Sequence, residues 1–299
     1  MDIRFLESFI AVVDHGSMVE ASRRLGVTPA AVAQRIHALE QEIGATLLTR
    51  IGRGVHPTEA GQSILERGRR IVGDVRDLRN LAATDLPAGE IRIGAISSAL
   101  TGLLPSALRQ LVKVAPDLDV YLLPGTSADL YRNVIDGSLD AAVLAQPPFA
   151  LPKTCEWQPL RSEPLIVLAH ASAAGRDAHE LLRTESFIRY DRINWGGRLA
   201  DSYLRKAGIR PRERLEMDSL EAIAIMVDAG LGVSLVPNWA PPWPEGLELF
   251  KASLPASAPQ RHLGIVWRRA SPNLRLVIVV VDALQESMVA GENEARTAS

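Results

Sequence analysis

The sequence contains very little cysteine and no long hydrophobic run. Its 299 residues include one cysteine, Cys155, which excludes an internal disulfide and a metal site with several thiolate ligands from one chain. No stretch approaches the about 18 uninterrupted apolar residues of a membrane span. No basic segment followed by an apolar stretch and a small-residue cleavage site opens the sequence, as a secretion signal requires. We therefore expect a cytoplasmic protein that has no membrane partner.

Charges are nearly balanced, while apolar residues are plentiful. The net charge is −2, so the bulk charge indicates neither a nucleic-acid partner nor a membrane partner. Apolar residues form 47% of the sequence, which is typical of globular domains that bury sizeable cores. The length suits about two domains. We expect one domain over residues 1–58, a linker helix over 59–86, and a second domain over 91–290.

The first 45 or so residues carry the signals of three consecutive helices. Ser17 and Glu20 form a capping box that begins the second helix, and Gly26 ends it. Thr28 as N-cap and Pro29 at the first helical position begin a third, longer helix. Apolar residues at helical spacing mark its buried side: Val32, Ile36, Leu39 and Ile43. Two helices joined by a tight glycine turn are therefore predicted.

The outward face of the third helix combines very small side chains with hydrogen-bonding ones. Its residues are Thr28, Ala30, Ala31, Gln34 and Arg35. Small side chains let a helix approach base edges, and Gln and Arg offer the bidentate geometries that suit adenine and guanine. This face is typical of a recognition helix in the major groove of DNA. An ordinary amphipathic helix is the alternative.

Arginines gather around this helix with few acidic residues between them. They are Arg23, Arg24, Arg35, Arg50 and Arg53. The run from Arg50 to His56 also holds two glycines, and Pro57 and Thr58 then open another helix, which predicts a basic hairpin wing. Arginines on such a wing would contact phosphates or the minor groove and add salt-sensitive affinity, and Thr58 is also expected to bind DNA. A solvated arginine face and a plain surface turn are the alternatives.

The helix that opens at Thr58 is expected to continue to about Ala82. Residues at alternating spacings of four and three form a heptad seam: Ile64, Gly68, Ile71, Val75, Leu78 and Ala82. Such a seam predicts that two copies of the helix pair in a homodimer. The alternative is that the stripe packs on its own domain.

Beyond a hinge-like connection at residues 85–89, strand and helix patterns alternate. Strands are expected over 91–95, 120–123, 141–145, 165–169 and 187–190, and helices over 101–114, 127–135, 195–207 and 220–229. This rhythm is typical of parallel sheets. Extended crossings at 165–169 and 263–267 predict two lobes. The first lobe is expected over about 91–162 and 268–290, and the second over about 163–267.

These residues resemble the LysR-type transcriptional regulators. The opening pattern that carries the resemblance is Phe9, Gly16-Ser17, Ala21, Leu25, Ala31-Val32, Ile36, Leu39-Glu40, Gly44, Leu47, Arg50 and Thr58-Glu59-Ala60-Gly61. Within that family, residues 27–36 are most similar to the branch that includes regulators of arginine and lysine exporters. Ala33 departs from the family, in which serine is usual, and removes a hydroxyl that would contact DNA.

Later segments are similar to the effector-domain landmarks of the same family, namely residues 91–94, 137–142 and 229–237. The resemblance implies an α+β multidomain fold with an N-terminal winged helix-turn-helix, a long linker helix and a two-lobed α/β effector domain like that of periplasmic binding proteins. It also implies binding to double-stranded operator DNA, a homodimer or tetramer, and contact with RNA polymerase where the protein activates transcription. A small-molecule effector, an amino acid or an organic acid, would lie between the lobes.

Residue chemistry supports the same place for the effector. Helix N-termini at the ends of parallel strands offer free amides to anions. The expected effector-binding residues are Ser97, Ser98, Thr101, Thr126 and Ser127 from the first lobe, and Tyr190, Asp191, Asn194, Trp195 and Ser219 from the second. Each serine serves equally well as a simple helix N-cap.

Two other functions would explain part of the sequence. A solute-binding protein would explain the two lobes but leaves the first 86 residues without a role, and export would favour it. An enzyme would draw on Asp191, His170 or His179, and turnover of a cleft ligand would favour it. The sequence has no glycine-rich phosphate loop, no His-Glu-x-x-His pattern and no nucleophile elbow. We expect no catalytic residue, no metal ligand and no cofactor.

Overall fold

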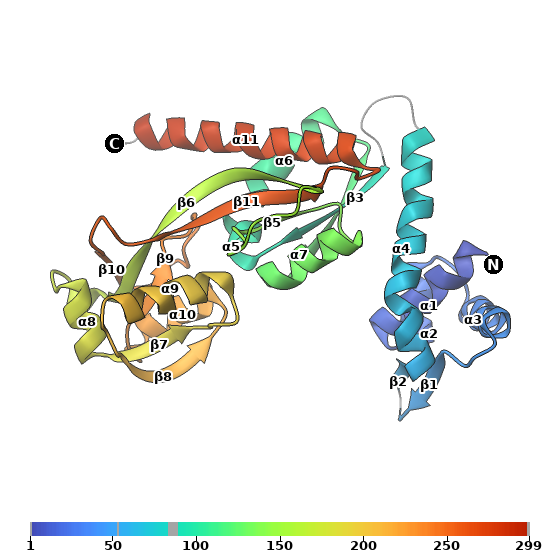
Figure 1. The fold of residues 1–299 in the computed structure, drawn as a ribbon, viewed down its shortest axis with the longest axis horizontal. Coiled ribbons are helices and arrows are strands. Elements are labelled where there is room, and N and C mark those ends of the chain that lie inside the picture. The colour runs from blue at the N-terminus through green and yellow to red at the C-terminus, as the bar shows by residue number, and fades with distance from the viewer. Residues whose placement is uncertain (1, 53, 83–88, 298–299) are drawn as a thin grey trace. The chain divides into compact units, whose positions relative to one another are not determined.

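A computed structural model of the protein describes residues 2–52, 54–82 and 89–297 (Figure 1). The chain divides into a first unit of residues 1–84 and a second unit that comprises residues 85–135 and 139–299. In the described part of the chain, no helix combines the length and the apolar content needed to cross a membrane.

The first unit consists of three short helices, a hairpin and one long helix. Its elements are α1 (Ile3–His15), α2 (Met18–Arg24), α3 (Pro29–Ile43), β1 (Leu48–Ile51), β2 (Gly54–Pro57) and α4 (Glu59–Ala82). The strands β1 and β2 pair antiparallel, with Leu48 opposite Pro57. The predicted helices and the predicted hairpin wing are therefore confirmed.

Side-chain caps begin these helices where the sequence predicts. Ser17 caps α2 and Thr28 caps α3, each accepting a hydrogen bond from the amide three residues on, at 3.5 and 3.2 Å. Thr58 caps α4 in the same way at 3.1 Å, and its hydroxyl donates to the Thr46 carbonyl at 2.7 Å. This second bond ties the start of the long helix to the chain just before the hairpin.

One apolar core holds the first unit together. Its buried members are Leu6, Phe9, Val12, Ala21, Val32, Ile36, Leu39, Leu47, Val55 and Leu65. The expectation that Ile43 is buried is wrong, since its side chain is 43% exposed. Ile43 is the last residue of α3, and the chain turns at Gly44, with φ of 77°, directly beyond it.

The first lobe of the second unit is built on parallel strands. Its opening elements are β3 (Gly89–Ala95), α5 (Ser97–Gly102), α6 (Leu104–Val114), β4 (Leu118–Pro124), α7 (Ser127–Asp136) and β5 (Ala141–Ala145). Strand β3 pairs in parallel with both β4 and β5, and the helices supply the crossovers. The helix expected over 101–114 is instead two helices that meet at Leu103. Pro105 lacks an amide donor, so it fits the first turn of a new helix and not a continuing one.

Two long strands, β6 (Cys155–His170) and β11 (Gln260–Arg268), join the lobes. The strands pair with each other up to Pro164, and from Leu165 onward β6 pairs with β9 (Ser234–Pro237) and β10 (Leu249–Ser253). The limits expected for the second lobe, residues 163 and 267, fall inside these strands. Residues 263–267 pair with β5, which places that stretch in the sheet of the first lobe.

The second lobe surrounds the far end of β6. It adds α8 (Ala178–Thr184), β7 (Ser186–Tyr190), α9 (Trp195–Lys206), β8 (Arg212–Met217) and α10 (Leu220–Asp228). Strand β7 pairs in parallel with β8, and its Phe187 forms an isolated parallel bridge with Val233, the residue before β9. Strand β8 was not expected, because its residues are mostly charged and exposed. Such charges are common on edge strands, where they prevent pairing with other chains.

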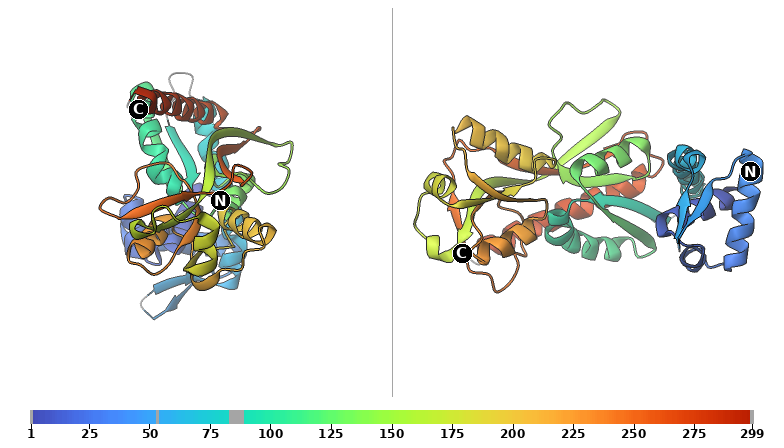
Figure 2. Two further views of the ribbon diagram at one scale, coloured as in Figure 1. Left: turned by 90° about the vertical axis from the view of Figure 1, so that its left-hand side faces the viewer. Right: turned by 90° about the horizontal axis from the view of Figure 1, so that it is seen from below.

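The C-terminal helix α11 (Leu274–Thr297) returns to the first lobe and lies along α6 (Figures 1 and 2). Its apolar residues Val277, Val280 and Leu284 join the buried core of that lobe. The two faces of the second-lobe sheet have separate cores, centred on Leu181 and Phe187 on one side and Ile223 and Trp239 on the other.

We expect Gly61→Ala to destabilise the first unit by about 1–3 kcal/mol, because the added Cβ overpacks a filled site. That Cβ would lie 2.1 Å from the Leu47 carbonyl oxygen, a backbone atom that cannot move alone. Gly68→Ala is the matched control in the same helix, since its Cβ would meet the flexible Leu6 side chain at 3.3 Å. Thermal unfolding followed by circular dichroism measures both variants. Equal losses of Tm would contradict the close approach at Gly61.

Candidate functional sites

The face of α3 that lies away from the core is exposed. Thr28, Ala30 and Gln34 are exposed as expected, whereas Ala31 is half-buried. His37 is also exposed, and its Nε2 lies 3.0 Å from Nε2 of Gln41. Neither residue was anticipated. They lie three and seven residues after Gln34, which places them on the same face of the helix. This spacing is the sequence feature that would have identified them.

Arg35 lies at the edge of this face. Its side chain is half-buried, and Nη1 donates to the hydroxyl of Ser8 in α1 at 3.4 Å. Ser8 is fully buried. Part of the Arg35 guanidinium therefore holds α3 against α1. The sequence also predicts that this side chain contacts bases.

The other predicted DNA-contacting residues lie around the hairpin and α2. Arg23 is exposed and pairs with Glu20 at 2.7 Å, and Arg50 is exposed on β1. The hairpin is attached to the turn after α1, because the Val55 amide donates to the Gly16 carbonyl at 2.9 Å. Arg53 lies outside the residues that the structure describes. An exposed ion pair such as that of Arg23 contributes little free energy, so the guanidinium can exchange Glu20 for a phosphate.

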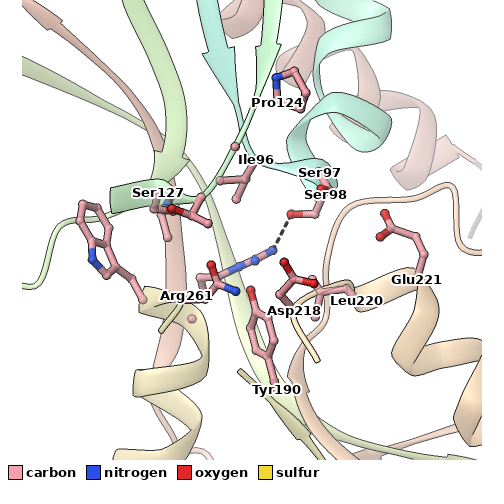
Figure 3. A pocket seen from close by; sticks show the side chains of 16 residues that line it. Ile96, Ser97, Ser98, Pro124, Ser127, Tyr190, Asp218, Leu220, Glu221 and Arg261 are labelled. Carbon is pink, nitrogen blue, oxygen red and sulfur yellow. Dashed lines mark hydrogen bonds between the residues drawn. The ribbon is translucent and has the colours of Figure 1, made fainter. Parts of the chain in front are cut away.

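In the second unit, a cavity of about 250 Å³ opens where α5, α7, α9 and α10 begin (Figure 3). Each of these helices follows a strand of a parallel pair, so their N-termini meet at the carboxyl ends of the sheets. The expected residues that line the cavity are Ser97, Ser98, Thr126, Ser127, Tyr190, Asn194 and Trp195. The topology thus brings together groups that are far apart in the sequence.

Three expected residues do not line the cavity, because each side chain is engaged locally. The Thr101 hydroxyl donates to the Ser97 carbonyl at 3.3 Å. Asp191 Oδ1 accepts from the Ile193 amide at 2.7 Å. Ser219 caps α10 and donates to Glu221 Oε2 at 3.3 Å.

A buried ion pair borders the cavity and was not anticipated. Arg261 in β11 is 3% exposed, and its Nε donates to Glu163 Oε2 at 2.7 Å. Its Nη2 donates to the hydroxyl of Ser98 at 3.0 Å, as Figure 3 shows. Glu163 is fully buried and also accepts from the Ala240 amide at 3.2 Å. Glu163 and Arg261 each lie two residues before a predicted extended crossing, 165–169 or 263–267. A charge at the start of each crossing was the signal, since such residues are buried only when paired.

Tyr190 lies beside this pair. Burial raises the pKa of its phenol above 10.0, and the nearby Arg261 guanidinium offsets part of that rise. The phenol therefore keeps its proton at neutral pH and remains a hydrogen-bond donor to the cavity.

Three aromatic rings stand at one side of the cavity. Trp195, which lines it, lies with its ring centroid 6.2 Å from that of Tyr131 and 5.7 Å from that of Phe149. Tyr131 and Phe149 are 5.3 Å apart in an edge-to-face arrangement. The cluster therefore connects α7 of the first lobe with α9 of the second.

A winged helix-turn-helix unit and a two-lobed α/β unit with a polar cavity at its strand ends define a ligand-responsive DNA-binding regulator. Residues 3–62 match the family described as bacterial regulatory helix-turn-helix protein, lysR family. Residues 84–289 match the LysR substrate binding domain. The chain belongs to the LysR family of transcriptional regulators.

Individual relatives agree with this assignment. The HTH-type transcriptional regulator ClcR of Pseudomonas putida is 31% identical over 277 residues, which cover 88% of this chain and 93% of ClcR. A full-length OxyR variant from Pseudomonas aeruginosa superimposes with a TM-score of 0.68 at 25% identity and covers 95% of both chains. The LysR-family regulator CbnR in complex with its target DNA has the same fold, with a TM-score of 0.68 at 24% identity, over 96% of this chain and 100% of that chain. The relatives are transcriptional regulators and not enzymes, which sets the two alternative functions aside.

We expect Arg261→Met to destabilise the second unit by about 3–5 kcal/mol, because the fully buried Glu163 carboxylate loses the cation that is hydrogen-bonded to it, while Arg161 Nε remains 3.7 Å from Oε1. The double variant Arg261→Met with Glu163→Gln removes both charges and should recover much of that loss. All five tryptophans lie in the second unit, so their fluorescence during urea unfolding reports on it. A double variant no more stable than Arg261→Met would show that the charge pair is not the cause.

The Tyr190 pKa predicts a loss of stability in alkali. Because the folded pKa is raised, the phenol contributes stability that is fully present below pH 10 and is lost as the pH rises through the folded pKa. In Tyr190→Phe this loss is absent, so urea midpoints measured above pH 10 should fall less steeply than in the unchanged protein. Parallel curves for the two proteins would contradict a protonated, buried Tyr190.

Proposed function

We propose that α3 reads the operator in the major groove while the hairpin wing contacts phosphates. The observation that carries this proposal is the exposed α3 face, on which the small Ala30 and Ala33 flank Gln34. Small residues permit close approach, and the Gln34 amide suits adenine. Arg23, Arg50 and Arg53 would supply phosphate contacts, with Thr58 and Ala31 at the edges of the interface. Ala33 in place of the usual serine is expected to change which bases are preferred.

We further propose that two copies pair through α4, and that such dimers associate into tetramers. The first part of the heptad seam packs on its own unit, since Gly68 lies against Leu6 and Ile64 joins the local core. Ile71 is 36% exposed and Val75 is half-buried, which leaves the later part of the helix for a partner. The side chains of Leu78 and Ala82, which complete the seam, lie outside those that the structure describes.

The effector is proposed to bind in the cavity that Ser98, Ser127 and Tyr190 line, where free helix amides and hydroxyls meet. Binding there would shift the lobes and change the geometry of the DNA-bound dimer. A reactive thiol is not part of this proposal, because burial raises the pKa of Cys155, which is 5% exposed. The effector is therefore expected to bind non-covalently.

A finer proposal concerns the branch of the family. Residues 27–36 favour the branch of arginine and lysine exporter regulators, whereas ClcR, OxyR and CbnR carry other names. Contact with RNA polymerase is proposed for the case in which the protein activates transcription. Cytoplasmic action is proposed because operator DNA is accessible there.

Selection of genomic DNA fragments by the purified protein tests the proposal. We expect a dyad-symmetric site, and we expect Gln34→Ala to lose about 1–3 kcal/mol of discrimination at one base pair of each half-site. Arg50→Ala should instead weaken binding to all sequences and reduce its salt dependence.

Gln62→Ala is the matched control, since Gln62 is an exposed glutamine of α4 in the same unit. It should leave both affinity and base preference unchanged. If Gln34→Ala selects the same sequences as the unchanged protein, α3 does not read bases through this residue.

A further inference from the structure

Charged side chains of both signs line the cavity of the second unit. Among the described lining residues, Arg261 is the cation, whereas Asp218 and Glu221 are carboxylates. We propose that the effector is a zwitterion, with a carboxylate bound beside Arg261 and a protonated amine bound by Asp218 and Glu221. This inference rests on the proposed function, since it takes the cavity as the effector site.

The start of α9 forms the part of the cavity in which the carboxylate of the effector would bind. Asn194 occupies the N-cap of this 12-residue helix and makes no side-chain cap hydrogen bond, so the first amides have no side-chain acceptor. Asn194, Trp195 and Gly196 all line the cavity. A Cβ built on Gly196 would lie 3.3 Å from Arg261 Cδ, so the first turn of α9 packs against the side chain of the buried arginine. Amides and guanidinium together suit one carboxylate.

The charges that line the cavity disfavour a strongly anionic ligand. The charge of Arg261 is offset by Glu163, whose Oε2 lies 2.5 Å from Nη2, and Arg161 Nε lies 3.7 Å from the other oxygen of that carboxylate without lining the cavity. Asp218 and Glu221 therefore leave the cavity lining with an excess of negative charge. Like charges at short range repel strongly in a partly buried site, so a dicarboxylate without an amine would be unfavourable there.

The part of the cavity in which the amine of the effector would bind contains a carboxylate oxygen without a hydrogen-bond donor. Glu221 Oε2 accepts from the Ser219 hydroxyl at 3.3 Å, but the buried Oε1 has no hydrogen-bond partner. A buried acceptor without a donor is unfavourable, and a ligand that supplies one would gain affinity. Figure 3 shows the carboxylates of Asp218 and Glu221 on the α10 side of the space that Ser98 and Arg261 border. An ammonium group carries three donors and can serve both carboxylates.

Calorimetry on the full-length protein tests this assignment. The probes are the L-amino acids and, for each one that binds, the matched acid that lacks the amine and the matched amine that lacks the carboxylate. Succinate serves as a dicarboxylate. We expect an amino acid to bind about ten- to hundredfold more tightly than either of its matched analogues, because each analogue leaves charged cavity groups unpaired.

Glu221→Gln should weaken binding of that amino acid about tenfold or more, and it should strengthen binding of the matched acid, because it removes a negative charge that repels the acid. Glu245→Gln is the control, because Glu245 is an exposed carboxylate of the same lobe that does not line the cavity. It should change neither affinity. Thermal unfolding without ligand confirms that both variants are folded.

Several results would overturn the inference. They are tighter binding of succinate than of any amino acid, equal binding of an amino acid and its amine-free analogue, an unchanged affinity in Glu221→Gln, or no binding by any probe. Selection of operator DNA by the same preparations separates the two proposals. If the preparations bind specific DNA and any of these results is obtained, only the proposal of a zwitterionic effector is contradicted. If they select no DNA, the proposed regulatory function is contradicted.

Discussion

The buried pair of Arg261 and Glu163 holds the second unit together at the point where its two lobes meet. The two residues face each other across the long strands β11 and β6, and two residues further on, at Leu165, β6 pairs with β9 instead of β11. A paired charge in this position fixes the register of the crossing strands, because an uncompensated buried charge would be strongly unfavourable. The same guanidinium donates to Ser98 at the start of α5, and the aliphatic part of the Arg261 side chain lies against Gly196 at the start of α9. One interaction thus connects the crossing strands to the helix N-termini of both lobes.

This arrangement explains why a ligand in the cavity can affect the geometry of the lobes. The cavity is bordered by the crossing strands themselves and by helices of both lobes, so a molecule that bridges Arg261 and Glu221 contacts both sides at once. The ring cluster of Tyr131, Phe149 and Trp195 provides a second connection between the lobes at the edge of the same space. A ligand that favours one arrangement of these contacts shifts the population toward it.

Local sequence patterns predicted much of the fold. Caps such as Thr28, helical periodicity and a basic glycine-containing run were sufficient for the helix-turn-helix and its wing, because these features depend on neighbouring residues. Strand ends followed by serine or threonine pointed to Ser97, Ser98, Thr126 and Ser127, which line the cavity, since parallel strands bring such ends together, but also to Ser219, which caps α10 instead. The partnership of Arg261 with Glu163 was not predictable, because 98 residues separate the two side chains and only the folded sheet brings them together. Strand β8 was not predicted for a different reason. An edge strand whose side chains remain in solvent needs no alternation of apolar and polar residues.

The most direct test of the account is footprinting of the selected operator with and without an amino acid that binds the protein. The account predicts a dyad-symmetric footprint whose length or pattern of cleavage changes when the amino acid is present, and that no longer changes in Glu221→Gln. A footprint that stays the same at saturating concentrations of the bound molecule would contradict control of DNA binding through this cavity.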